Sequence, residues 1–199
     1  MHTLVAFLRH GSNAVLVLGT LVFGTLFAVG TLAAPPWAIP IGLSLFFISE
    51  YTTHRFLLHA PPAGSAFIRR LQHRLHYDHH TEPARLDLLF LPPWFLVPAI
   101  ALVSALYATI SHDLGVTMGL VLGNTIGLLY YEWVHYVAHI PFRPITPFGR
   151  YVKKYHLWHH FKNETLWFGV TNPIVDVVGR TYRNVEGAAR SGRTHRLFP

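Results

Sequence analysis

The sequence has no cysteine and few charged residues. Without cysteine the chain has no disulfide bond, no thiolate zinc site, no cysteine-ligated iron–sulfur cluster and no thiol nucleophile. Charged residues make up 13% of the 199 residues, whereas hydrophobic residues make up 51%. An average soluble domain has about 25% charged residues, so this balance indicates a chain that lies in lipid. The length allows one domain.

Four apolar segments are long enough to cross the ~30 Å hydrocarbon core of a bilayer at ~1.5 Å per residue. The first carries no charge, and it is too long for a signal peptide and lacks a cleavage site. Very short connections, around Pro35 and His112, join the segments in two helical hairpins. We therefore expect an all-α polytopic membrane protein, one domain over residues 1–199, with transmembrane helices at about 13–34, 37–59, 88–110 and 116–140.

The fourth segment contains glycine at every fourth position. Gly119, Gly123 and Gly127 have the small-xxx-small spacing that lets the backbones of two helices approach closely. Ordinary use of glycine in a membrane helix explains the series equally well.

Basic residues outnumber acidic ones, 16 to 9, and their positions predict the topology. If the N-terminus is cytoplasmic, both hairpin tips lie outside and carry no Lys or Arg, so every basic residue lies inside or at the border. This arrangement places residues 60–87 and 141–199 in a cytosolic helical cap, with both termini in the cytoplasm. A membrane surface, in the bacterial inner membrane or the endoplasmic reticulum, is then the expected partner of the positive charge, and nucleic acid is not.

Histidine is unusually common, with 15 residues, and eleven of them lie in four short segments. The segments are HRFLLH at 54–59, HRLHYDHH at 73–80, HYVAH at 135–139 and HLWHH at 156–160. They lie at the ends of spans and in the cytosolic parts, and the predicted topology brings all four to one face of the membrane.

The spacing of these histidines suits metal ions. Residues four apart on a helix, such as His135 and His139, share one face, and imidazole is a good ligand for iron, zinc, copper and nickel. His54 and His59 are five apart, about 140° around an ideal helix, so they can share an ion only if the helix ends or distorts there. Ten ligands are too many for one ion and suit two. The candidate ligands are His54, His59, His76, His79, His80, His135, His139, His156, His159 and His160.

Other interpretations of the histidines fit less well. A metal-buffering tract is usually short, biased in composition and disordered. A zinc hydrolase of the H-E-x-x-H type needs a motif that is absent here. A metal transporter places its ligands at mid-membrane rather than at span ends. We expect His73, Asp78 and Glu132 to orient ligands from outside the coordination sphere, and we assign no role to the isolated His2, His10, His112 and His195.

The combined pattern H-x₄-H, H-x₂-H-H, H-x₃-H, H-x₂-H-H resembles the fatty acid hydroxylase / sterol desaturase superfamily. The resemblance is greatest to the fatty acid 2-hydroxylase branch. It rests on HRFLLH, on YYEWVHYVAH at 130–139 and on YHLWHHFKNETLWFGVTNPIVDVVGRT at 155–181, and it covers residues 50–181.

The resemblance implies a non-haem monooxygenase that hydroxylates a lipid acyl chain, with fatty acid 2-hydroxylation as the expected reaction. It implies two metal ions at the cytosolic face, iron in the active enzyme with zinc able to take the same places, and O₂ as co-substrate. The haem-binding His-Pro-Gly-Gly of fused cytochrome b5 domains is absent, so we expect a separate electron donor of the cytochrome b5, ferredoxin or reductase type.

The resemblance also suggests how the ligands divide between the two ions. One ion would have His54, His59, His76, His80, His156 and His160, and the other would have His79, His135, His139 and His159. A sterol or carotenoid hydroxylase or desaturase of the same superfamily is the alternative reading, followed by a metal-binding membrane protein without enzymatic activity.

Overall fold

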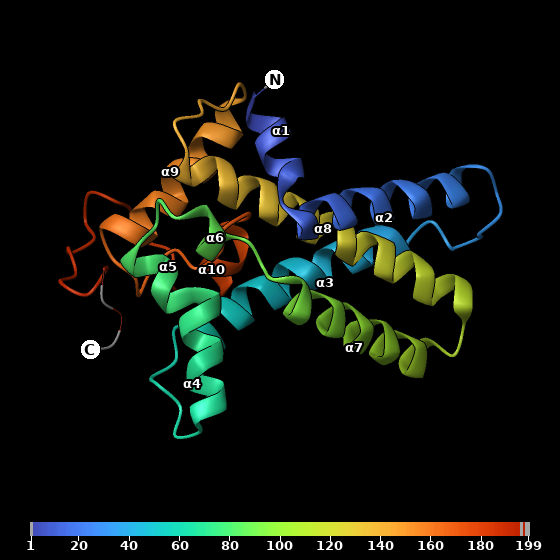
Figure 1. The fold of residues 1–199 in the computed structure, drawn as a ribbon, viewed down its shortest axis with the longest axis horizontal. Helices are drawn as coiled ribbons and strands as arrows, with labels where there is room; N and C mark the ends of the chain where they lie inside the picture. Colours follow the sequence, from blue (N-terminus) through green and yellow to red (C-terminus); the bar gives the residue numbers. More distant parts are fainter. Residues whose placement is uncertain (1, 196, 198–199) are drawn as a thin grey trace. The chain divides into compact units, whose positions relative to one another are not determined.

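The computed structural model describes residues 2–195 and 197, and within them every regular element is helical (Figure 1). Arg196, one of the basic residues of the predicted cytosolic tail, lies outside these residues. The chain divides into two compact units, one of residues 1–46 and 91–132, the other of residues 47–90 and 133–199. The expectation of an all-α chain is confirmed.

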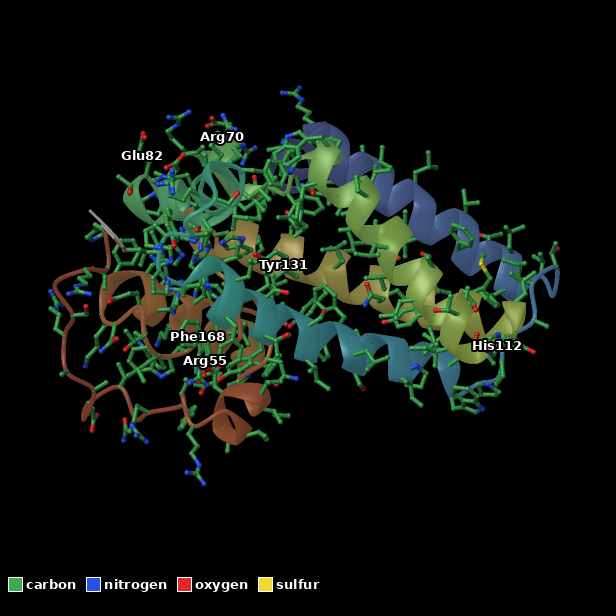
Figure 2. All side chains as sticks on the ribbon, turned by 90° about the horizontal axis from the view of Figure 1, so that it is seen from below. Arg55, Arg70, Glu82, His112, Tyr131 and Phe168 are labelled. Atoms are coloured by element: carbon green, nitrogen blue, oxygen red, sulfur yellow. The ribbon has the colours of Figure 1, made fainter. Side chains whose placement is uncertain are left out.

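The first unit contains the short helix α1 (His2–Arg9) and long apolar helices. The long helices are α2 (Gly11–Ala28), α7 (Pro93–Ser111), and the N-terminal parts of α3 (Ala38–Thr53) and α8 (Leu114–His139). Helix α2 ends earlier than predicted because Gly30 has a left-handed backbone, with φ of 75°, which stops the helix. Helix α7 begins at Pro93, where proline suits the first helical position. Figure 2 shows His112, also left-handed, at the turn between α7 and α8.

Among the described residues, three helical stretches are long and apolar enough to cross a membrane: Gly11–Ala28, Leu86–Ser111 and Leu114–His139. Their outer surfaces are apolar, as in Leu18 and Leu102, which are 64% and 73% exposed. Such exposure is unfavourable in water and suits contact with lipid. The predicted second span differs, because its α-helix, α3, has 16 residues, about 24 Å, before a different helical form begins at His54.

The glycine series packs α8 against α3, as its spacing predicts for closely approaching helices. A Cβ atom at Gly123 would lie 2.0 Å from the carbonyl oxygen of Ile39, and one at Gly119 would lie 2.6 Å from the Cβ of Ala38. On the opposing helix, a Cβ at Gly42 would lie 2.1 Å from the carbonyl oxygen of Leu120. Only glycine allows the two backbones to come this close.

The second unit contains short helices and the histidine segments. Its elements are η1 (His54–Leu58), α4 (Ala66–Gln72), η2 (His73–Tyr77), α5 (Asp78–Thr81), α6 (Leu86–Leu89), α9 (Pro147–Phe161) and α10 (Ile174–Val178), together with the C-terminal parts of α3 and α8. The second histidine segment is helical. Its buried residues are mixed, with His76, His79 and His80 beside Leu75 and Tyr77, so it lacks the regular aliphatic periodicity that signals a helix in a sequence.

Helix α9 is held at its N-terminus and again near its middle. At its start, Thr146 accepts a hydrogen bond from the N–H of Gly149, and Pro147 occupies the first helical position. Further along, the Lys153 ammonium donates to three carbonyl oxygens in the last turn of α8 and just after it, those of Val137, Ile140 and Phe142, at 2.7–2.8 Å. Lys153 therefore satisfies the carbonyls that a helix end leaves without partners, and it ties α9 to α8.

The close contact between α3 and α8 predicts that a single methyl group destabilises the first unit. In Gly123→Ala the new Cβ must displace backbone, so we expect the stability to fall by about 1–3 kcal/mol, the usual cost of overpacking. Thermal unfolding followed by circular dichroism in detergent measures it. Gly19→Ala is the matched control, because a Cβ at Gly19 meets nothing within 4 Å. Equal melting temperatures for the two variants would contradict this packing.

Candidate metal centre

Ten histidines of the second unit gather in two groups of five. The first group is His54, His59, His76, His80 and His159, and the second is His79, His135, His139, His156 and His160. Within each group the ring nitrogens that face inward all lie within 4.8 Å of one another. All ten candidate ligands predicted from the sequence are thus brought together, in two sets of a size that suits one ion each.

In the first group the Nε2 atoms face one another across short gaps. The Nε2 of His76 lies 2.7 Å from that of His59 and 3.1 Å from that of His54, and the Nε2 of His159 lies 3.0 Å from that of His59. Neighbouring ligands at 90° around an ion with metal–nitrogen bonds of ~2.1 Å stand about 3.0 Å apart. The spacing of these nitrogens is therefore that of ligands around a metal ion.

The second group has the same geometry. The Nε2 of His135 lies 3.0 Å from that of His79, and the Nε2 of His139 lies 2.9 Å from that of His156. His160, a member of the second group, contacts rings of both groups. Its ring centre lies 4.0 Å from that of His80, on which it stacks, and 4.6 Å from that of His139. The two candidate sites are therefore immediate neighbours.

The division between the groups differs from the one the family resemblance suggested. His159 belongs with His54 and His59, whereas His156 and His160 belong with His79 and His139. The reason is helical geometry: His156 and His160, four apart on α9, share one face, and His159 points to the adjacent one. In both H-x₂-H-H segments the middle histidine lies in a different group from its two neighbours.

A π-helical turn aligns the pair that ideal geometry would separate. Element η1 begins at His54, and the N–H of His59 donates to the carbonyl oxygen of His54 at 3.0 Å, an i to i+5 bond. The wider turn places both rings in the first group, with centres 4.9 Å apart. The distortion required by the five-residue spacing is present.

Backbone carbonyls fix which nitrogen of a ring faces the centre. The Nδ1 of His54 lies 2.5 Å from the oxygen of Phe168, that of His159 lies 2.7 Å from the oxygen of Leu166, and that of His80 lies 3.0 Å from the oxygen of Thr194. Since a carbonyl only accepts, each Nδ1 carries the proton and each Nε2 of the neutral ring has a free lone pair.

Ring nitrogens without a protein partner show that the two groups fit metal ions. The Nε2 of His80 is buried and has no protein partner, and both ring nitrogens of His160 are buried in the same way. A buried polar atom without a partner is costly. A cation at the centre of each group would remove this penalty, so the residues present fit the two metal ions that the sequence predicts.

The histidines outside the apolar spans are held neutral by their surroundings. Burial, and to a smaller extent the neighbouring imidazoles, hold the pKa well below its ordinary value of 6.5. This applies to His76, His79, His80, His156, His159 and His160. Neutral imidazole is the form that binds a metal ion.

The three residues predicted to orient ligands lie elsewhere. His73 and Asp78 bond to each other at 3.0 Å, with both side chains about half exposed, and the structure brings neither to a ring of the two groups. Glu132 lies in the first unit, buried, and accepts from the N–H of Leu91 at 3.3 Å. Their orienting role stays a prediction. The sequence did not reveal the residues that hold candidate ligand rings, Leu166, Phe168 and Thr194, because they act through backbone carbonyls, which any residue type has.

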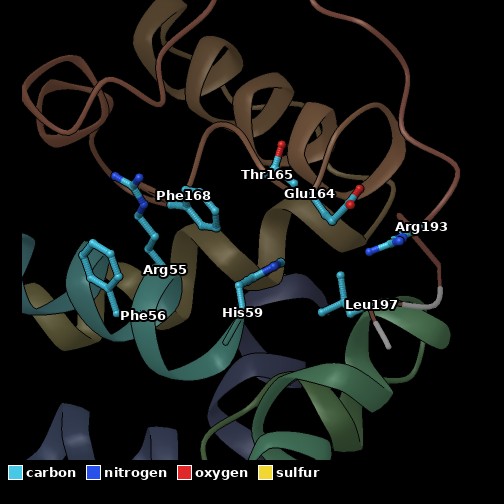
Figure 3. Close-up of a pocket in the computed structure, with 8 residues that line it drawn as sticks. All are labelled: Arg55, Phe56, His59, Glu164, Thr165, Phe168, Arg193 and Leu197. Carbon is cyan, nitrogen blue, oxygen red and sulfur yellow. The ribbon is translucent and has the colours of Figure 1, made fainter. Parts of the chain in front are cut away.

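A pocket of about 300 Å³ reaches the first group. Figure 3 shows the His59 ring at this pocket, with Phe168 on one side and Leu197 on the other. Its wall is mixed in character, with the charged residues Arg55, Glu164 and Arg193 beside apolar ones. The pocket gives a small molecule access to a histidine of the first group.

Comparison with known proteins assigns the family. The family model described as fatty acid hydroxylase matches residues 39–181. The chain belongs to the fatty acid hydroxylase family. The ten histidines all lie in the matched region, and the resemblance expected from the histidine pattern is confirmed.

Several relatives carry names that describe acyl hydroxylation. The chain is 36% identical over 150 residues to the ceramide very long chain fatty acid hydroxylase SCS7 of Saccharomyces cerevisiae, covering 71% of this chain and 37% of the yeast protein. It is 32% identical to the dihydroceramide fatty acyl 2-hydroxylase FAH2 of Arabidopsis thaliana, covering 76% of this chain and 63% of that protein. It is 29% identical to human fatty acid 2-hydroxylase, covering 73% and 40%.

A solved structure shares the fold. In full-length scs7p, of which only the hydroxylase domain is visible, the match has a TM-score of 0.73 at 30% identity and covers 95% of this chain and 68% of that one. The chain spans about two fifths of the length of the mammalian and yeast relatives that it matches.

The lowered histidine pKa values predict that the metal-free protein loses stability in acid. Below about pH 6.5 the unfolded chain binds protons that the folded chain does not, so stability falls as the pH drops toward the lowered pKa values. Each such histidine contributes up to about 1.4 kcal/mol per pH unit.

Thermal unfolding of metal-free protein at pH 7.5, 6.5 and 5.5 tests this dependence, and we expect the steepest fall below 6.5. His112→Asn, which replaces an exposed histidine at the α7–α8 turn, should show the same pH dependence as wild type. A melting temperature that stays constant from pH 7.5 to 5.5 would show that the buried imidazoles accept protons freely.

Proposed function

We propose that this chain is an O₂-dependent di-metal monooxygenase that hydroxylates a lipid acyl chain at carbon 2. The observation that carries the proposal is the pair of five-histidine groups in a member of the fatty acid hydroxylase family. The names of the relatives, which include fatty acid 2-hydroxylase and dihydroceramide fatty acyl 2-hydroxylase, support the carbon position and the acyl substrate.

The ten histidines are the proposed ligands, divided as the structure groups them. Iron is the metal of the active enzyme, and when bound it supplies the O₂-dependent oxidation of a C–H bond, which no side chain can supply alone. The protein holds the imidazoles neutral, keeps the centre buried and, at His54, His80 and His159, fixes the ring nitrogen that faces the first ion. Electrons come from an external donor of the cytochrome b5, ferredoxin or reductase type.

The substrate is a membrane lipid, and the chain lies in the membrane that contains it. We propose four spans, with α3 and the π-helical turn of η1 together forming the second. His54 and His59 then lie at the end of that span, and both termini and the histidine groups lie on the cytoplasmic side. The hairpin tips, which carry no Lys or Arg, support this orientation.

Removal of one ligand should abolish the reaction. In His159→Ala the first group loses an Nε2 that faces the centre, so we expect no product, while the protein still inserts in the membrane. Mass spectrometry of lipids from cells that express wild type or variant measures it: wild type alone should yield an acyl chain heavier by one oxygen atom, and its fragmentation should place that atom on carbon 2. His112→Asn, outside both groups, is the control and should retain activity.

Other outcomes of the same measurement would replace the proposal. An acyl chain lighter by two hydrogens would indicate a desaturase, and an altered sterol or carotenoid would change the substrate class. Turnover by His159→Ala at the wild-type rate would contradict the di-metal model.

The absence of cysteine makes the topology directly testable. Leu114→Cys, at the tip of the second hairpin where the side chain is 74% exposed, should react with a membrane-impermeant maleimide added outside intact cells. Gly187→Cys, in the tail, should react only after the membrane is opened. Labelling of the tail from outside would reverse the proposed orientation.

A further inference from the structure

One loop holds two ligand rings that come from different helices. Leu166 and Phe168, two residues apart, present their carbonyl oxygens to the Nδ1 of His159 and of His54, at 2.7 and 2.5 Å. The Phe168 ring also packs edge-on against His54 and His59, with centres 5.6 and 5.2 Å apart. Both held rings belong to the first histidine group. The position of this loop therefore sets the orientation of two of the five proposed ligands of one ion.

A single buried carboxylate holds that loop. Asp176, at the start of α10, is fully buried, and its two oxygens accept from the N–H of Phe168 at 2.8 Å and the N–H of Gly169 at 2.7 Å. Thr181 donates a third hydrogen bond to it at 2.6 Å. The buried carboxylate is thus satisfied by two N–H groups of the loop together with the Thr181 hydroxyl.

The covalent geometry links this carboxylate to the imidazole of His54. The N–H of Gly169 and the carbonyl of Phe168 belong to the same planar peptide group. A hydrogen bond to that N–H therefore fixes the plane whose oxygen accepts from the His54 Nδ1. The bond also polarises the peptide, so its oxygen becomes a better acceptor. The second bond of Asp176, to the N–H of Phe168, fixes the preceding peptide plane in the same way.

The loop is shaped so that the carboxylate can reach it. A Cβ atom at Gly169 would lie 2.8 Å from the Oδ2 of Asp176 and 2.3 Å from the carbonyl oxygen of Asn172, so only glycine fits there. Between the two acceptor carbonyls, Trp167 has a left-handed backbone with φ of 58°. Such a conformation persists only where tertiary contacts hold it, and here the Trp167 N–H and indole donate to the oxygens of Thr181 and Arg183.

We propose that Asp176 is a positioning residue for the first metal ion, which acts through the Phe168–Gly169 peptide on His54 and through the same loop on His159. Carboxylates often orient a ligand histidine by direct contact, and here a peptide group lies between the carboxylate and the ring. The proposal rests on the proposed di-metal function.

Cobalt titration of the metal-free full chain in detergent tests it, because the visible absorption of Co²⁺ reports its coordination without any turnover. Wild type should bind two ions. Asp176→Asn keeps the shape of the side chain but replaces one acceptor oxygen with an N–H₂ group that cannot accept. We expect one binding step to weaken by about 10–100-fold, the usual effect of losing a residue that orients a ligand, and its absorption bands to shift, while the other step stays unchanged.

Two further variants separate this role from general stability. Glu50→Gln also removes a buried carboxylate that accepts a backbone N–H, that of Thr171 at 2.9 Å, but it touches neither acceptor peptide, so both cobalt steps should remain. If Asp176→Asn does not fold, Thr181→Val removes one of the three bonds to the carboxylate and should weaken the same step to a smaller degree.

The results also separate this proposal from the proposed function. If both steps weaken equally, or if neither changes in folded Asp176→Asn, Asp176 is a structural residue only and the proposal is wrong. If wild type itself binds fewer than two ions, the di-metal function fails before any variant is compared, and the positioning role fails with it.

Discussion

Buried imidazole rings that converge on two centres are the constraint on which the second unit depends. Two groups of five rings bring Nε2 atoms to 2.7–3.1 Å, the spacing of neighbouring ligands around one ion. Burial holds the rings outside the spans neutral, which is the form of imidazole that binds a metal ion. A cation in each group balances the arrangement, and the surrounding backbone has the task of keeping the rings in place.

The polypeptide meets this task mainly with backbone groups. Carbonyls of Leu166, Phe168 and Thr194 take the outer protons of three rings, and the Lys153 ammonium joins the helices that carry five of the histidines. Two buried carboxylates of the second unit, Asp176 and Glu50, serve a similar purpose, since both accept from loop N–H groups. Carbonyls need no counter-charge, which suits a centre whose net charge comes from its metal ions.

Much of the site could be predicted from the sequence, because histidine spacing determines which rings share a helix face. The ten rings that gather, the distortion between His54 and His59, and the close packing of Gly119 and Gly123 all follow from residue type and interval. The division of His156, His159 and His160 does not, since it depends on how α9 is turned toward its neighbours. The acceptor carbonyls were equally hidden, because their signal lies in backbone geometry.

The π-helical turn at His54 has a consequence for how such proteins are compared. One extra residue in a helical turn shifts everything before it by about 100° relative to everything after it, unless the turn widens to absorb the insertion. In this chain the widened turn absorbs it, so the helix keeps its register on both sides. Two histidines four residues apart on a regular helix (H-x₃-H) and two histidines five apart across a π turn (H-x₄-H) therefore place their rings in the same way. In an alignment, a one-residue gap within this motif therefore indicates a change of helix type. The same two histidines can still serve as ligands.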